Sequence, residues 1–293
     1  MKNDDMHLGV YSDRVLSLDG FGNHITDHFN DFGRGFLMVS VHGADMAVDT
    51  LQLSPENLDE GYELQWPEVG IRLNTENLSR VYAKEKSRLG AGTIECDFTD
   101  SPNSFSVIWI PEYFNQKAYN LVTEAYASNL LSDMKLRAVR DADCIKLNIC
   151  PCCRVRRERI RNDTANHPVS IILQGLTGTE IMPELRIASD HVDMLCAWLI
   201  REIRIWQGEV TCVGDHHVFR VDVAMIHTIQ ICKMMKRGVE CSVLRCYHSL
   251  GGVIFEMSIA CAKHSNLWHE ICAAAEFGYH TCGGDSSQME NED

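Results

Sequence analysis

The chain has 293 residues, of which 45% are hydrophobic and 23% charged, and its formal net charge is −14 at pH 7. A chain of this length and composition can bury a large core, so it needs neither disulfides nor a metal merely to fold. The negative charge repels nucleic-acid phosphates, so binding to DNA or RNA would require a local basic patch. No run approaches the roughly 18 apolar residues of a membrane span, and the polar, acidic first ten residues predict no secretory signal.

The acidic charge is concentrated at the two ends of the chain. Residues 1–60 contain eleven acidic side chains against three basic ones, giving −8, and residues 285–293 add four acidic side chains. The simplest role of this charge is solubility, and the alternatives are binding of a basic partner or imitation of a nucleic acid. The 13 cysteines, in a chain without a secretory signal, are expected to be reduced thiols, which predicts a location in the cytosol or the nucleus.

Residues 1–142 are predicted to form an acidic, β-rich domain that ends in a helix. Residues 36–41 and 105–110 are β-rich runs bounded by turn-forming residues, and each predicts a strand. Residues 51–70 contain two prolines and several polar residues, which is typical of a connecting loop. Apolar residues then recur at helical spacing within residues 116–139, at Tyr119, Val122, Tyr126 and Leu130.

Residues 143–167 are rich in cysteine and arginine and are predicted to form a loop between two domains. Cys150, Cys152 and Cys153 lead directly into five arginines, Arg154, Arg156, Arg157, Arg159 and Arg161. Thiols beside arginines have a lowered pKa, which suits metal binding or redox reactivity, and His167 could complete a zinc site with these cysteines and Cys144. The arginines could contact nucleic-acid phosphates or act as a nuclear address, whereas the simplest interpretation is that they pair with the chain's own acidic segments.

Residues 168–282 are predicted to form a mixed α/β domain rich in cysteine and histidine. Residues 169–173 and 181–187 indicate two strands joined by a turn at 176–180, and Ser189 and Asp190 are suitable N-caps for a helix over 191–204. This order resembles the opening of a ubiquitin-like β-grasp module, and Leu176-Thr-Gly178 is similar to the turn of ubiquitin. The resemblance covers about 40 residues, lacks the terminal di-glycine, and implies a binding fold.

The remainder of this region is predicted to contain further strands, one hairpin and a last helix. Strands are expected over 210–213 and 218–223, a hairpin over 242–248 and 253–259, and a helix over 260–277. Residues 283–293 are polar and acidic and are predicted to form a disordered tail.

Cysteine and histidine side chains are crowded between residues 241 and 282. Zinc prefers four such ligands supplied as two close pairs. One candidate set combines Cys246 and His248 on a strand with Cys261 and His264 at a helix start, and a second combines His269, Cys272, His280 and Cys282. The alternative is that all these residues are ordinary core residues, because buried cysteine behaves as a small hydrophobe. The run Asp215-His216-His217 is a third, less specific candidate for a metal site.

Common enzyme signatures are missing, since we find no phosphate-binding loop, dinucleotide-binding glycine motif, nucleophile elbow or kinase motif. The sequence therefore predicts an α+β protein that acts as a non-enzymatic adaptor or assembly protein, stabilised by zinc and working through other proteins. A viral accessory protein or an organism-specific subunit of a complex would have these features. Two alternatives stay open: an enzyme with a Cys/His site, such as a thiol or metal hydrolase, and a nucleic-acid-associated protein or acidic mimic of nucleic acid.

Overall fold

The structure is a computed structural model, and it describes residues 14–19, 28, 31–50, 58–59, 63–65, 69–73, 78–85, 92–98, 103–132 and 151–276. The strands are β1 (Arg14–Leu18), β2 (Gly35–Val41), β3 (Ala44–Asp49), β4 (Leu58–Asp59), β5 (Glu63–Gln65), β6 (Val69–Leu73), β7 (Leu78–Glu85), β8 (Gly92–Phe98), β9 (Ser104–Trp109), β10 (Ala127–Ser132), β11 (Glu184–Ala188), β12 (Val192–Ala197), β13 (Glu202–Trp206), β14 (Glu209–Val213), β15 (His217–Asp222), β16 (Thr228–Lys236), β17 (Val239–Tyr247) and β18 (Val253–Ala260). The α-helices are α1 (Gln116–Tyr126), α3 (Pro151–Asn162), α4 (Pro168–Leu176) and α5 (Cys261–Glu276), with short 3-10 helices η5 (Pro111–Tyr113), η6 (Thr164–Asn166) and η7 (Val223–Met225).

The strands form two sheets whose neighbouring strands pair antiparallel. The ten-stranded sheet has the order β10-β1-β7-β8-β9-β2-β3-β15-β14-β13, and the eight-stranded sheet has the order β16-β17-β18-β11-β12-β6-β5-β4. Each sheet joins strands from before residue 133 to strands from after residue 151, through β3 and β15 in one and β6 and β12 in the other. The α+β class predicted from the sequence is confirmed, whereas the division into two domains near residue 145 stays a prediction.

Alternating burial explains why the central strands form where they do. Along β2 and β3 every second side chain is buried, as expected of strands with one face against the core. The two strands are joined by a two-residue turn, His42-Gly43, in which both residues have a positive φ. Such a turn matches the right-handed twist of the strands and so fixes their register.

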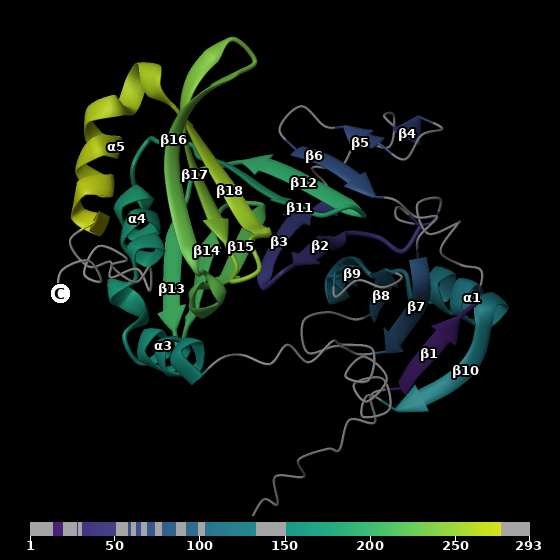
Figure 1. Cartoon of the computed structure of the whole chain (residues 1–293). Helices are drawn as coiled ribbons and strands as arrows, with labels where there is room; N and C mark the ends of the chain where they lie inside the picture. Colours follow the sequence, from purple (N-terminus) through teal and green to yellow (C-terminus); the bar gives the residue numbers. More distant parts are fainter. Residues whose placement is uncertain are drawn as a thin grey trace, which may run out of the picture.

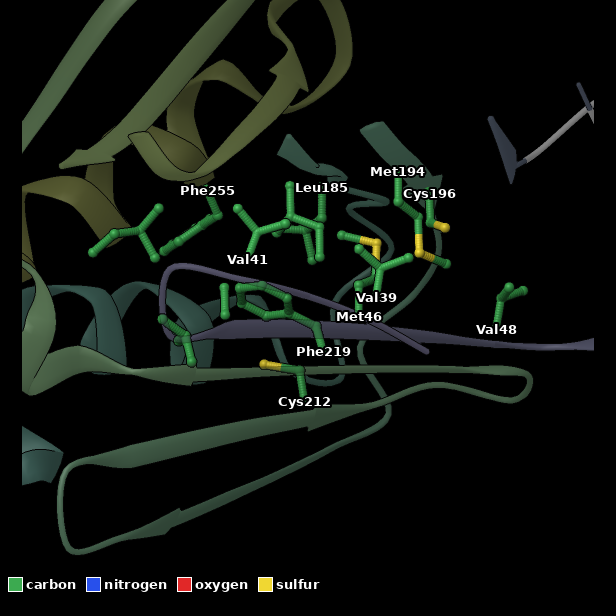
Figure 2. Packing of buried hydrophobic residues seen from close by; sticks show 14 of the residues in the cluster. Val39, Val41, Met46, Val48, Leu185, Met194, Cys196, Cys212, Phe219 and Phe255 are labelled. Atoms are coloured by element: carbon green, nitrogen blue, oxygen red, sulfur yellow. The ribbon is translucent and has the colours of Figure 1, made fainter. Parts of the chain in front are cut away.

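The core lies between the two sheets (Figure 2). Val39 and Met46 from β2 and β3 face Leu185 and Met194 from β11 and β12. The rings of Phe219 on β15 and Phe255 on β18 lie 5.0 Å apart between their centroids, which joins the sheets through an aromatic contact. Such pairs stabilise a core beyond the area that they bury.

Helices α3, α4 and α5 lie at one end of the sandwich, near β13 and β16, whereas α1 packs on β8 and β9 through Tyr119 (Figure 1). α5 packs against α4 and against β17, where the indole of Trp268 donates a hydrogen bond of 2.7 Å to Ser242. α4 and α5 approach closely at Gly175, where any side chain would collide with Ile271. In the ranges that the structure describes, no helix is long and apolar enough to cross a membrane.

Three local predictions differ from the structure. Residues 169–173, predicted as a strand, lie in helix α4. Residues 191–204, predicted as a helix, contain strand β12 and the first part of β13. The β-grasp resemblance is therefore wrong, because its strand-turn-strand-helix order does not occur. The Cys/Arg-rich segment, predicted as a loop, contains helix α3, and the predicted tail at 283–293 lies outside the described residues.

Candidate functional site: a groove on the outer face of the eight-stranded sheet

A groove with a cavity volume of about 600 Å³ lies on the face of the eight-stranded sheet that points away from the core. We call it the outer groove. It is lined by apolar and charged residues of six strands, of the β16–β17 turn and of the loop before β11: Gly70, Ile71, Met182, Glu184, Arg186, Asp193, Leu195, Ala197, Lys236, Arg237, Val239, Cys241, Ser258 and Ala260. A smaller hollow of about 250 Å³ adjoins it and shares Arg186. The larger volume lies within the range of about 300–1,000 Å³ that is usual for small-molecule sites.

Strand alternation places the charged side chains of β11 and β18 in this groove. On β11, Leu185 and Ile187 point into the core and are fully buried, so Glu184 and Arg186 point to the opposite face. Cross-strand pairing then sets Glu184 beside Ser258. The groove is therefore a consequence of register, and it gathers residues that are far apart in the sequence.

Glu256 on β18 lines the smaller hollow, and it is the centre of an ionic network that extends into the outer groove through Lys236. Its carboxylate accepts hydrogen bonds of 2.5 Å from Lys236 and 2.6 Å from Arg245, although the residue is only 7% exposed. Lys236 also donates to Ser258 at 2.8 Å and to Glu184 at 3.4 Å. Buried carboxylates persist when they are paired and hydrogen-bonded, as here.

The network shifts the ionisation of its members. Burial raises the pKa of the Glu256 carboxyl, but the hydrogen bonds from Lys236 and Arg245 outweigh burial and hold this pKa below its ordinary value. The hydrogen bond from Arg186 to Asp193, at 2.5 Å, raises the pKa of the Arg186 guanidinium. These shifts favour the charged forms of Glu256 and Arg186, and both residues lie close to apolar side chains of the groove and the hollow.

The two members of the first predicted zinc set whose side chains the structure describes, Cys246 and His248, have separate surroundings. Cys246 is fully buried in the core between the sheets, and burial raises the pKa of its thiol well above the ordinary value. His248 lies in the turn after β17, beyond a register shift between Cys246 and Tyr247, and its ring contacts that of His42 at 5.0 Å between centroids. Cys261 and His264 lie on α5, but their side chains are outside the described part of the chain.

The described cysteines of the Cys/Arg segment and His167 also have different surroundings. Cys152 is exposed and Cys153 half-buried on α3, while Cys150 lies outside the described residues. His167 is buried and caps α4, where its ring Nδ1 accepts a hydrogen bond of 3.3 Å from the amide of Val169. Burial and the nearby Arg156 charge lower the pKa of His167 to about 3.

The remaining histidine and cysteine candidates have separate surroundings. His269 is exposed and Cys272 buried on α5, and His280 and Cys282 lie outside the described residues. His217 is buried against the indole of Trp198, with 5.1 Å between ring centroids, whereas the half-exposed His216 lies near Asp49. As expected for adjacent residues, the two histidines do not converge.

The predicted nucleic-acid-binding arginines lie on α3 and have different environments. Arg156 is buried and donates a hydrogen bond of 2.7 Å to the carbonyl of Ile226, so it anchors the helix. Arg154, Arg159 and Arg161 are exposed, and Arg161 lies 3.8 Å from Asp222. Arg161 therefore pairs with a carboxylate of the same chain, as the simplest interpretation expected. That carboxylate, Asp222, belongs to the folded region after α3 and not to the acidic ends of the chain.

Sequence reasoning missed the outer groove, although one signal for it was present. Arg245 and Glu256 face each other across the β17–β18 hairpin, and that hairpin was predicted. A charged pair opposite one another on a strand pair marks a polar face. Lys236, Glu184 and Arg186 could not be added, because they come from strands whose order the sequence does not reveal.

The comparisons with known proteins come from structure alone. No protein-family model matches the chain, and no curated protein matches it by sequence. The fold is similar to that of ChuS, a heme oxygenase of E. coli, with a TM-score of 0.61 and 10% identity over 89% of this chain and 88% of that chain. It is also similar to apo-PhuS, a heme-binding protein from Pseudomonas aeruginosa, with a TM-score of 0.60 and 9% identity over 90% of this chain and 87% of that chain.

These findings correct the functional prediction from the sequence. No three metal-ligating side chains gather among the described residues, and the similar folds are those of heme proteins, so the zinc-stabilised adaptor and viral accessory protein are wrong. The similar folds give no support to the two alternatives either, the Cys/His hydrolase and the nucleic-acid-associated protein. The chain has the fold of ChuS and PhuS, and what it binds must be argued from its own groove.

Proposed function

We propose that the protein binds a planar, mostly apolar ligand that carries carboxylates, of the tetrapyrrole class to which heme belongs, in the outer groove. The observation that carries this proposal is the groove itself, in which apolar Ile71, Leu195 and Val239 lie next to the cationic Lys236 and Arg237. Ligand sites combine a mainly apolar lining with a few placed polar groups that fix orientation. The likeness to heme-binding folds selects tetrapyrroles among the ligands that such a lining could take.

The residues of the groove fit the ring and the carboxylates of such a ligand. Leu195, Ala197 and Val239 would contact the ring, and Lys236 and Arg237 would pair with the carboxylates. For an iron atom the lining offers the sulfur atoms of Cys241 and Met182, which belong to residue types that ligate heme. None of the lining residues that the structure describes is a histidine. Bound heme supplies redox-active iron, and our proposal concerns its binding only.

A cytoplasmic location belongs to the same proposal, because reduced cysteines suit that compartment. The nuclear alternative finds no support in the fold. Binding of partner proteins also belongs to the proposal. If the protein passes its ligand to an acceptor protein, it must contact that acceptor.

The test is a titration of the full chain with hemin and with iron-free protoporphyrin, followed by absorbance and fluorescence. A Leu195→Arg variant fills the groove with a long charged side chain and should lose most of the binding. The matched control is Leu121→Arg, because Leu121 is 61% exposed on α1 and does not line the groove. Unchanged affinity of the Leu195→Arg variant would overturn the proposal.

A further inference from the structure

We infer that Lys236 is the residue that receives a ligand carboxylate, and that it does so by exchanging the carboxylate of Glu256 for that of the ligand. The outer groove would therefore select ligands by their acidic groups. This inference rests on the proposed function, because it concerns the same groove.

Lys236 lies at the tip of the β16–β17 hairpin, where the backbone pairs with no further described strand. β17 pairs with β18 only from Cys241 onward, so residues 235–240 of the β16–β17 hairpin pair with one another at the edge of the described sheet. Met235 and Val239 in this tip are 67% and 44% exposed. Segments with few buried contacts open at low free-energy cost, so this tip can move without disturbing the core.

Ionic contacts hold the tip over the groove. Lys236 bonds to Glu256 and Ser258 on β18, and Arg237 lies 3.9 Å from the Glu184 carboxylate on β11. These partners belong to the centre of the sheet rather than to the hairpin itself. The tip is therefore attached to the groove by the same two cations that a carboxylate ligand would bind.

Lys236 can leave Glu256 without stranding a buried charge. Glu256 keeps the Arg245 guanidinium at 2.6 Å, so it remains paired. In the groove and the adjoining hollow, four cations (Arg186, Lys236, Arg237 and Arg245) face three carboxylates (Glu184, Asp193 and Glu256). One ligand carboxylate would balance this excess of one positive charge. When Lys236 leaves, each of its two carboxylate partners keeps another cation, because Glu256 retains Arg245 and Glu184 retains Arg237.

The experiment compares two ligands with the same ring: iron-free protoporphyrin, which has two carboxylates, and its dimethyl ester, which has none. Lys236→Met should weaken binding of the acid by about 10-fold, the loss expected for one charge-assisted hydrogen bond, and leave binding of the ester unchanged. Lys236→Arg should restore acid binding to within about 3-fold, because the charge remains. Glu184→Gln removes a competing carboxylate and should strengthen acid binding alone, by a few-fold.

The outcomes separate this inference from the proposed function. If the wild-type protein binds acid and ester equally, or if Lys236→Met weakens both equally, the role of Lys236 is refuted while binding in the groove stands. If the wild-type protein binds neither porphyrin, both the proposed function and this inference fail. Circular dichroism of each variant checks that the fold is retained.

Discussion

Protonation of the buried histidine His167 should make the folded protein less stable in mild acid. His167 is 5% exposed and caps α4 through its ring nitrogen. Burial, and then the positive charge of Arg156, lower its pKa from 6.5 to about 3. The folded protein therefore keeps this ring neutral, whereas the unfolded chain protonates it below about pH 6.5.

The sign and size of the effect follow from linkage. Between about pH 6.5 and 3 the unfolded state binds one proton more than the folded state, so the stability that is fully present above pH 6.5 is lost as the pH falls. Each pH unit in that window lowers the free energy of unfolding by about 1.4 kcal/mol. Acidification from about pH 7 to about pH 5 should therefore remove about 2 kcal/mol through His167 alone.

Urea denaturation of the wild-type protein and of a His167→Asn variant, at both pH values, measures this contribution. Asparagine can cap α4 but does not titrate, so the variant keeps the helix start and loses the pH dependence of this site. The wild-type free energy of unfolding should fall by about 2 kcal/mol more than that of the variant. Equal losses in the two proteins would refute the assignment of His167 as a buried neutral histidine.

Two further predictions concern the core and the cysteines. Phe255→Ala removes one ring of the Phe219–Phe255 contact between the sheets, so it should lower the free energy of unfolding by about 3–5 kcal/mol in urea titrations. Leu121→Ala, at an exposed position, should change the free energy of unfolding by less than about 0.5 kcal/mol. Similar effects of the two substitutions would contradict the sandwich core. A thiol reagent under native conditions should label the exposed Cys152 well before Cys212, because burial raises the pKa of the Cys212 thiol to about 12. Peptide mass spectrometry reports the order, and early labelling of Cys212 would count against its position in the core.

Local patterns in the sequence predicted those elements whose form depends on local chemistry. The β17–β18 hairpin follows from two β-rich runs around Leu250-Gly-Gly252, and the strands near residues 36–41 and 105–110 follow from turn residues at their ends. The last helix was predicted within one residue at each end, because its apolar residues recur at helical spacing.

The wrong assignments occur where tertiary burial overrides local preference. Residues 169–173 are rich in β-branched side chains, which favours a strand, yet they form α4, which starts at Pro168 and is buried on several sides. Residues 192–197 contain apolar residues at spacings that suit either period, and burial of Val192, Met194 and Cys196 decides for a strand.

The outer groove could not be predicted, because its residues meet only through strand order. Lys236 and Glu184 are 52 positions apart in the sequence. Their strands, β16 and β11, belong to the same sheet because β17 and β18 pair between them. The prediction of zinc as cofactor was wrong for the opposite reason. Cysteine and histidine crowd in the sequence, but alternation along β17 sends the side chain of Cys246 into the core and that of Cys241 to the outer groove.

The ionic network is itself an argument for binding in the outer groove. Replacement of a buried ion pair by apolar residues is often neutral or stabilising, so the Lys236–Glu256–Arg245 contacts are a weak source of stability. Threonine or valine would also suit an outward sheet face, so packing alone does not explain why charged side chains occupy these positions. Binding of a carboxylate ligand, as we propose, would explain them, because such a ligand binds best to cations that are already held in place and partly desolvated. In that proposal the carboxylates of Glu256 and Glu184 hold Lys236 and the hairpin tip over the groove in the free protein, and a ligand carboxylate takes the place of Glu256 at Lys236.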